Sequence, residues 1–237
     1  MMRQLTARKG INMENTAGKD RKSSMITCVK HESIGEEISN AISHGIGGML
    51  AIAGTVLLII KSAKYGTAMS VVCSCLYGAS LIILYTISTL FHALTAPMGK
   101  KVFQILDHCS VFILIFGTYI PVSLVLIKGA LGWTIFGIIA ACTVVGIVFN
   151  SISLSRWYKI SLVLYIVMGW LVVLAAKPVI NAVDLCGIIL LVGGGVAYTA
   201  GVVLYKRKRK YSHFIWHLFV MAGSIMHFFF VFNYCYK

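Results

Sequence analysis

The sequence predicts an all-α membrane protein: a seven-transmembrane helix bundle with its N-terminus in the cytoplasm and its C-terminus outside. The first observation is composition, since 59% of the 237 residues are hydrophobic and only 12% are charged. Soluble globular chains have about 45–50% apolar and about 25% charged residues. The second observation is that the apolar residues form long runs with short connections, and the third is the distribution of Lys and Arg. The composition excludes a soluble globular chain.

The long apolar runs define the predicted spans. A helix needs about 20 mostly apolar residues to cross a bilayer. Seven runs of this kind occur, at residues 42–60, 69–93, 106–127, 131–150, 160–176, 184–204 and 213–234. Residues 1–32 are polar and basic and lack the apolar core of a signal peptide, so they are predicted to be a disordered basic cytoplasmic tail. The predicted domains are therefore this tail, 1–32, and a seven-helix transmembrane domain, 33–237.

The Lys and Arg residues predict the orientation of the helices. Sixteen of the 21 lie in the tail and in the second, fourth and sixth connections, and five lie in the other connections and at the C-terminus. Cytoplasmic loops of membrane proteins carry the excess of Lys and Arg, so the N-terminus is predicted to be cytoplasmic. The net charge of +14 is then a topology signal, and no nucleic-acid binding is expected. A basic run is predicted to contact anionic lipid headgroups: Lys206, Arg207, Lys208, Arg209 and Lys210.

The first helix is predicted to begin near Ser33, because Ser33 to Glu36 has the form of a capping box. Glu37, Asn40 and His44 follow at steps of three and four residues, so they share one helix face. This polar stripe is either a solvated interfacial face or the wall of the cytoplasmic mouth of the bundle. In the second case it would form a secondary site.

The second and third spans each bring a polar group to the predicted cytoplasmic edge. Ser88 and His92 are four residues apart at the end of the second span, so their side chains share a face. The third span opens with Asp107. Five of the seven acidic residues precede the first span and Asp184 begins the sixth, which leaves Asp107 as the one carboxylate expected at that edge. Spans four to six contain almost no ionisable groups and are predicted to be packing helices.

The last span contains His213 and His217, which lie one helical turn apart on one face. Histidine inside a bilayer is costly and usually has a function, although histidines at a helix end can also be merely interfacial. The predicted topology brings both to the depth of His92, and three neutral imidazoles suit Zn²⁺ with a fourth position left for water. Asp107 would then orient or deprotonate that water, and Ser88 would stabilise a developing oxyanion.

These residues together resemble the hemolysin III family, which is related to the progestin and adipoQ receptors and to the alkaline ceramidases. The resemblance covers about Glu36 to Phe232. It implies a seven-helix bundle with zinc held at the three histidine positions, the Asp and Ser beside the metal, and the lipid-amide hydrolysis proposed for the receptor branch. The matching pieces are Glu37-x-x-Asn40, Ser43-His44-Gly45, Ser88-x-x-x-His92, Asp107-His108, and His213-x-x-x-His217 running on to His227-Phe228.

The sequence favours two functions and leaves an ion or metal transporter open as well, although spans four to six lack the charged residues that an ion path needs. The first is a zinc-dependent membrane hydrolase of lipid amide or ester bonds in the bacterial plasma membrane, with a membrane lipid as its substrate. The second is a non-enzymatic sensor or a lytic factor, a haemolysin, in which zinc is structural and has four protein ligands. A retinal-type receptor is excluded, because its chromophore needs a lysine in the last span and none lies between His213 and Tyr236.

Overall fold

Long α-helices form nearly all of the chain in the computed structural model, which describes residues 32–205 and 209–236. Within these ranges there is no β-strand. A short π-helical segment, η1 (Val122–Ile127), follows α4, and a 3-10 segment, η2 (Leu171–Ala175), follows α5. The α-helices are α2 (Ile34–Tyr65), α3 (Ala68–Ala93), α4 (Pro97–Pro121), α5 (Gly129–Trp170), α6 (Ala176–Ala182), α7 (Leu185–Tyr205) and α8 (Ser212–Tyr234). All but the last residue of the predicted tail, 1–32, lies outside the described residues.

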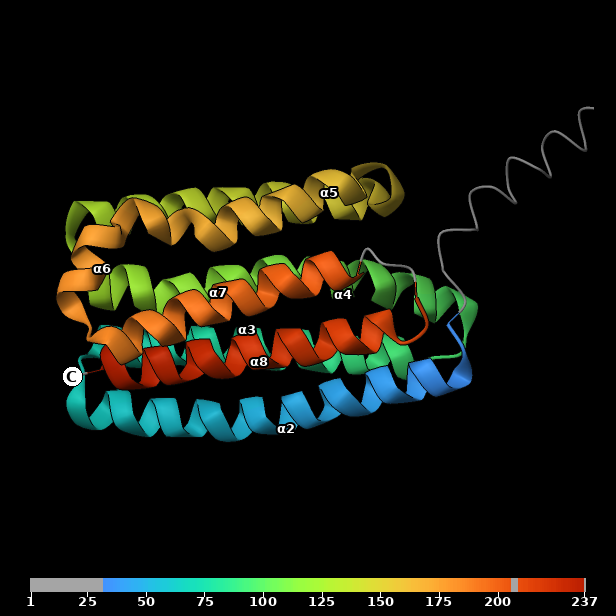
Figure 1. Cartoon of the computed structure of the whole chain (residues 1–237), viewed down its shortest axis with the longest axis horizontal. Helices are drawn as coiled ribbons and strands as arrows, with labels where there is room; N and C mark the ends of the chain where they lie inside the picture. Colours follow the sequence, from blue (N-terminus) through green and yellow to red (C-terminus); the bar gives the residue numbers. More distant parts are fainter. Residues whose placement is uncertain (1–31, 206–208, 237) are drawn as a thin grey trace, which may run out of the picture. The chain divides into compact units, whose positions relative to one another are not determined.

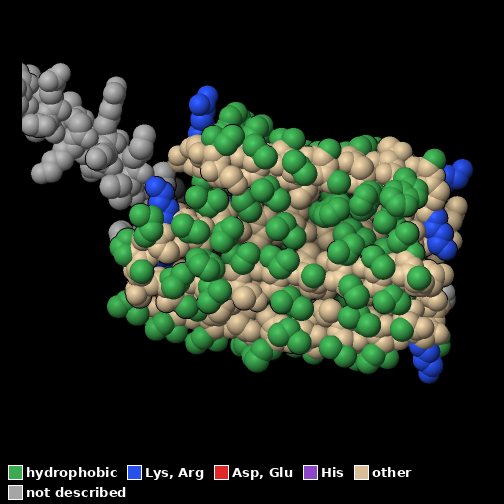
Figure 2. Space-filling view, turned by 180° about the vertical axis from the view of Figure 1, so that it is seen from behind, with side chains coloured by type: hydrophobic (Ala, Val, Ile, Leu, Met, Phe, Trp, Pro, Cys, Tyr) green, Lys and Arg blue, Asp and Glu red, His purple; other side chains and the backbone are tan. Residues whose placement is uncertain are grey.

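The surface of the helices is apolar along their length. Six helical stretches of the described chain are long and apolar enough to cross a membrane. Figure 2 shows one face of the molecule covered with hydrophobic side chains, with Lys and Arg near its two ends. So large an apolar surface is unfavourable in water, whereas helices satisfy their own backbone hydrogen bonds and can face lipid. The prediction of an all-helical membrane protein is confirmed.

The number of spans differs from the prediction because one stretch, Gly129–Ala182, is 54 residues long and contains two predicted spans. Its backbone leaves the helical conformation at Ser153. Beyond that point Ser161 donates a hydrogen bond to Asn150 Oδ1 at 2.6 Å, although a straight helix would separate these residues by about 16 Å. The chain therefore reverses near Ser153, and α5 runs along one edge of the bundle and back (Figure 1). The count of seven separate spans is not confirmed.

Small residues let the helices that carry the polar groups pack closely. A Cβ atom on Gly78 of α3 would lie 2.3 Å from Thr55 of α2, and one on Gly117 of α4 would lie 2.0 Å from Ser80 of α3. Such distances allow only glycine, which brings neighbouring backbones together as in other membrane helix pairs. The α2–α3, α7–α8 and α3–α4 pairs have the most extensive packing. As a result, the end of α3 is held beside α2 and α4.

The first turn of α2 also fixes the start of α8. The backbone N–H of Tyr211 donates to Glu36 Oε1 at 2.7 Å, and Tyr211 has a left-handed backbone with φ of 60°. Of the predicted lipid-binding run, Lys206, Arg207 and Lys208 lie outside the described residues, whereas Arg209 and Lys210 are exposed just before α8. Their contact with lipid headgroups stays a prediction.

Candidate metal centre

Three imidazoles meet at the end of the bundle where α2 and α8 begin and α3 ends. His92 comes from α3, and His213 and His217 come from successive turns of α8. One ring nitrogen from each lies within 4.8 Å of the others. His92 and His217 are buried, with 4% and 1% of their surface exposed, and His213 is half-buried. The structure therefore brings together the three histidines that the sequence analysis expected to converge.

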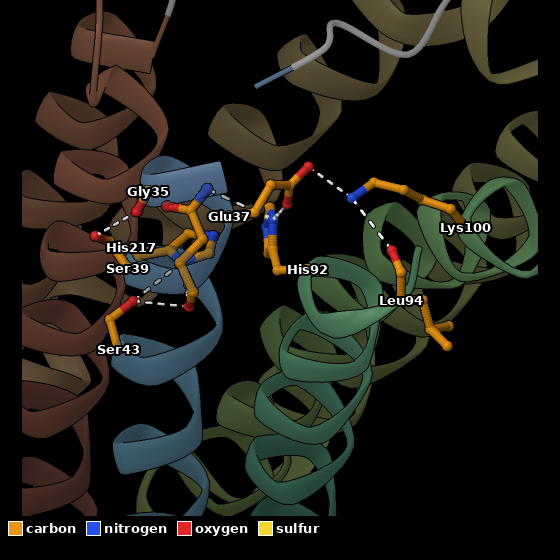
Figure 3. Close-up of polar contacts among 9 residues, drawn as sticks. Gly35, Glu37, Ser39, Ser43, His92, Leu94, Lys100 and His217 are labelled. Atoms are coloured by element: carbon orange, nitrogen blue, oxygen red, sulfur yellow. Dashed lines mark hydrogen bonds and ion pairs between the residues drawn. The ribbon is translucent and has the colours of Figure 1, made fainter. Parts of the chain in front are cut away.

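The hydrogen bond of His92 shows which of its ring nitrogens carries the proton. Its Nδ1 lies 2.7 Å from Glu37 Oε2, and because a carboxylate can only accept, Nδ1 is the donor. Nε2 of His92 is buried and has no hydrogen-bond partner among the described residues. Figure 3 shows Glu37 between His92 and Lys100. Nε2 of His92 therefore has a lone pair that can bind a metal ion.

His217 has the same tautomer for a different reason. Its Nδ1 lies 3.3 Å from the backbone oxygen of Asn40 and 3.3 Å from the hydroxyl of Ser43. The Ser43 hydroxyl donates to the Asn40 oxygen at 2.9 Å, so both oxygens face Nδ1 as acceptors. Nδ1 of His217 therefore carries the proton, and its Nε2 can act as a ligand atom.

This donor set fits a divalent metal ion. Histidine ligands generally donate their second ring N–H to a carboxylate or a backbone carbonyl, as His92 and His217 do. Zinc–nitrogen bonds are about 2.0–2.1 Å long, so two ligands of one ion are at most about 4.2 Å apart. The cluster, with its nitrogens within 4.8 Å, needs only a small closing movement. The three histidines could hold a metal ion, and their assignment as ligands stays a prediction.

The polar stripe of α2 points into the bundle and lies against the histidine cluster. Glu37 contacts His92, and Asn40 contacts His217. The His44 ring stacks on the His217 ring with centroids 3.5 Å apart. This orientation is the second of the two alternatives for the stripe, the mouth of the bundle and not a solvated face. A separate secondary site at Glu37, Asn40 and His44 stays a prediction.

Ser88 and Asp107 line a cavity beside the cluster. The cavity has a volume of about 100 Å³, and His44 and His217 also contribute to its wall. Ser88 is buried and its hydroxyl has no hydrogen-bond partner within the described parts of the chain. Asp107 is half-buried and is not among the three residues whose nitrogens converge. The predicted catalytic residues thus share a cavity with His217 of the cluster, and their roles stay predictions.

The cavity continues away from the histidine cluster as an apolar space. A second cavity of about 150 Å³ is lined partly by the same residues, among them Thr118, Tyr119 and Trp170. His227 also faces both, and its Nε2 lies 3.0 Å from the backbone oxygen of Leu191, to which it donates. His227 therefore has a structural partner of its own.

Lys100 is a charged residue of this region that the sequence analysis did not single out. Its Nζ lies 2.6 Å from Glu37 Oε1, although the two residues are 63 positions apart in the chain. No motif spacing links them. The only sequence feature that could have suggested this contact is that both residues lie near helix ends expected on the same side of the membrane.

The fold and the cluster define a class of protein: a helical integral membrane protein with a possible metal centre among the helix ends at one end of its bundle. A family described as "Haemolysin-III related" matches residues 32–228. The chain belongs to this family, which confirms the resemblance seen in the sequence motifs.

The sequence matches to named relatives cover most of the chain. It is 44% identical to Hemolysin-3 of Bacillus cereus, over 84% of this chain and 91% of the relative. It is 42% identical to the Hemolysin-3 homolog of Bacillus subtilis, over 86% of this chain and 97% of the relative. A more distant relative is the human monocyte to macrophage differentiation factor, 25% identical over 89% of this chain and 87% of that protein. The bacterial relatives and the apolar helices together identify an integral protein of the bacterial plasma membrane.

Proposed function

We propose that the protein is a zinc-dependent membrane hydrolase that cleaves an amide or ester bond of a membrane lipid. The observation that carries this proposal is the shared cavity, in which a histidine of the cluster, a carboxylate and a hydroxyl border an apolar space. A hydrolase needs a nucleophile, a base and a group that stabilises the oxyanion. This cavity has candidates for all three functions.

Each residue has a distinct role in the proposed reaction. His92, His213 and His217 would hold the zinc ion through ring nitrogens. Zinc supplies Lewis-acid chemistry, because it acidifies a water molecule and polarises a carbonyl group. Asp107 accepts a proton from the attacking water and passes it to the leaving amine or alcohol as the carbonyl carbon–nitrogen or carbon–oxygen bond breaks. Ser88 donates its hydroxyl proton in a hydrogen bond to the carbonyl oxygen as negative charge develops there.

Two side chains support a lipid with a polar group as the occupant of the cavity. Neither ring nitrogen of His44 and no part of the Ser88 hydroxyl has a hydrogen-bond partner among the residues the structure describes. Both side chains are buried and line the cavity. Buried polar atoms without partners are unfavourable, and the carbonyl or hydroxyl group of a lipid would satisfy them. The apolar walls beyond would take its acyl chain.

The test is acyl release by the purified, zinc-loaded protein in detergent micelles, with ceramide and phosphatidylglycerol as probes. We expect free fatty acid from at least one of the two lipids, loss of this release after chelation, and recovery when zinc is restored. Absence of release from both lipids would contradict the proposal. Leakage of protein-containing vesicles that persists with a chelator would favour a lytic factor, which the name of the Bacillus cereus relative suggests.

We also propose that the chain crosses the membrane seven times from a cytoplasmic N-terminus. The reversal near Ser153 and the uneven distribution of Lys and Arg support this arrangement. Cys186, exposed at the start of α7, would then lie outside, whereas a single crossing by Gly129–Ala182 would place it inside. A variant that retains only Cys186 should react with a membrane-impermeant thiol reagent on intact cells. A cysteine-free variant carrying Lys101→Cys should react only after lysis, and the reverse pattern would refute this topology.

A further inference from the structure

Helix α2 contributes none of the three clustered histidines, yet its first turns contact two of them. Glu37 accepts a hydrogen bond from His92, and the backbone oxygen of Asn40 accepts one from His217. We propose that Glu37 is a positioning residue of the metal centre, which fixes the tautomer and orientation of His92 and is itself held by Lys100. This inference rests on the proposed zinc site and assigns a role to a carboxylate that is not one of the three clustered histidines.

The hydrogen bonds of Glu37 explain why it acts through His92. Its Oε2 lies 2.7 Å from His92 Nδ1 and its Oε1 lies 2.6 Å from Lys100 Nζ, so each carboxylate oxygen already has a partner. With Nδ1 protonated, His92 can offer only Nε2 to a metal, and that atom has no other partner within residues 32–205 and 209–236. A carboxylate behind a histidine ligand also raises the basicity of the ring.

Lys100 provides the countercharge that this arrangement needs. The Glu37 side chain is 19% exposed and that of Lys100 is 16% exposed. A carboxylate removed this far from water is unfavourable unless it is paired. Lys100 belongs to the first turn of α4, and its ammonium group also lies 5.3 Å from the centre of the Phe91 ring of α3. The carboxylate, the histidine and the countercharge thus come from α2, α3 and α4, and the two contacts of Glu37 join the ends of these three helices.

The test is the zinc dissociation constant of the full-length protein in detergent, measured by competition with a chromogenic chelator. We expect Glu37→Ala to weaken zinc binding by about 10–100-fold, the usual effect of removing a partner of a metal-bound histidine. Glu37→Gln should weaken it less, because an amide oxygen can still accept from Nδ1. Lys100→Met should also weaken it less than Glu37→Ala. Lys101→Met is the matched control, because Lys101 is exposed on the next position of α4, and it should bind zinc like the unmodified protein.

A second measurement separates positioning from simple structural support. The increase in Tm on adding zinc to the metal-free protein should shrink in Glu37→Ala and Glu37→Gln, whereas a purely structural role would lower Tm equally with and without zinc. If the unmodified protein binds no zinc, the proposed function fails. If it binds zinc and the Glu37 variants bind it equally tightly, only the inference about Glu37 is overturned. Should Glu37→Ala not fold, unchanged dissociation constants in Glu37→Gln and Lys100→Met would overturn it.

Discussion

Purified protein carrying His217→Ala is expected to lose its bound zinc. His217 is the most deeply buried of the three clustered histidines, with 1% of its surface exposed, and its Nδ1 hydrogen bonds fix its orientation. Removing a ligand should weaken zinc binding by more than the roughly 10–100-fold that follows from changing a residue behind a ligand. Metal content per chain, determined by inductively coupled plasma mass spectrometry after dialysis, measures the effect.

His227→Ala is the matched control for this prediction. It makes the same substitution on the same helix, at a histidine that donates to the backbone of α7 and lies outside the cluster. This variant should retain its zinc. Zinc that remains bound in His217→Ala and in a double variant with His213→Ala would show that the cluster is not the metal site, and the proposed hydrolysis would then have no catalytic centre.

Asp107→Asn is expected to abolish most lipid hydrolysis while leaving zinc in place. The substitution keeps the size of the side chain in the cavity wall but removes the base that accepts a proton from water. General base catalysis contributes about 10²–10⁴-fold to enzymatic rates, and the initial rate of acyl release by zinc-loaded protein should fall by that factor. The metal content of the same sample distinguishes a lost base from a lost metal.

The control for this variant is Asp184→Asn. Asp184 accepts hydrogen bonds from Tyr234 and from the backbone N–H of Gly187, outside the cavity that Asp107 lines. Its replacement should leave the rate of hydrolysis unchanged. An unchanged rate in Asp107→Asn would eliminate the proposed base. Loss of zinc together with activity would instead indicate that Asp107 is a fourth ligand, as expected for a structural zinc site.

Local features of the sequence predicted where the membrane helices lie. They also predicted that His213 and His217 share one helix face. Apolar runs predicted the membrane helices, because a bilayer requires a minimum apolar length whatever the neighbours are. The four-residue step between His213 and His217 predicted their common face, because helix geometry is the same in any context. The predicted fourth and fifth spans leave residues 151–159 as a connection, whereas the structure reverses the chain near Ser153 with almost no loss of helix.

Composition and neighbours along the chain were enough to predict the membrane class, the positions of the apolar helices and which polar residues occur near helix ends. The folded bundle was needed to show that Glu37 lies against His92, 55 positions away, and that Lys100 pairs with the same carboxylate. It also shows that His44 stacks on His217. Such contacts depend on how each helix is rotated about its axis, and in a mostly apolar bundle that rotation is set by close packing at positions such as Gly78 and Gly117.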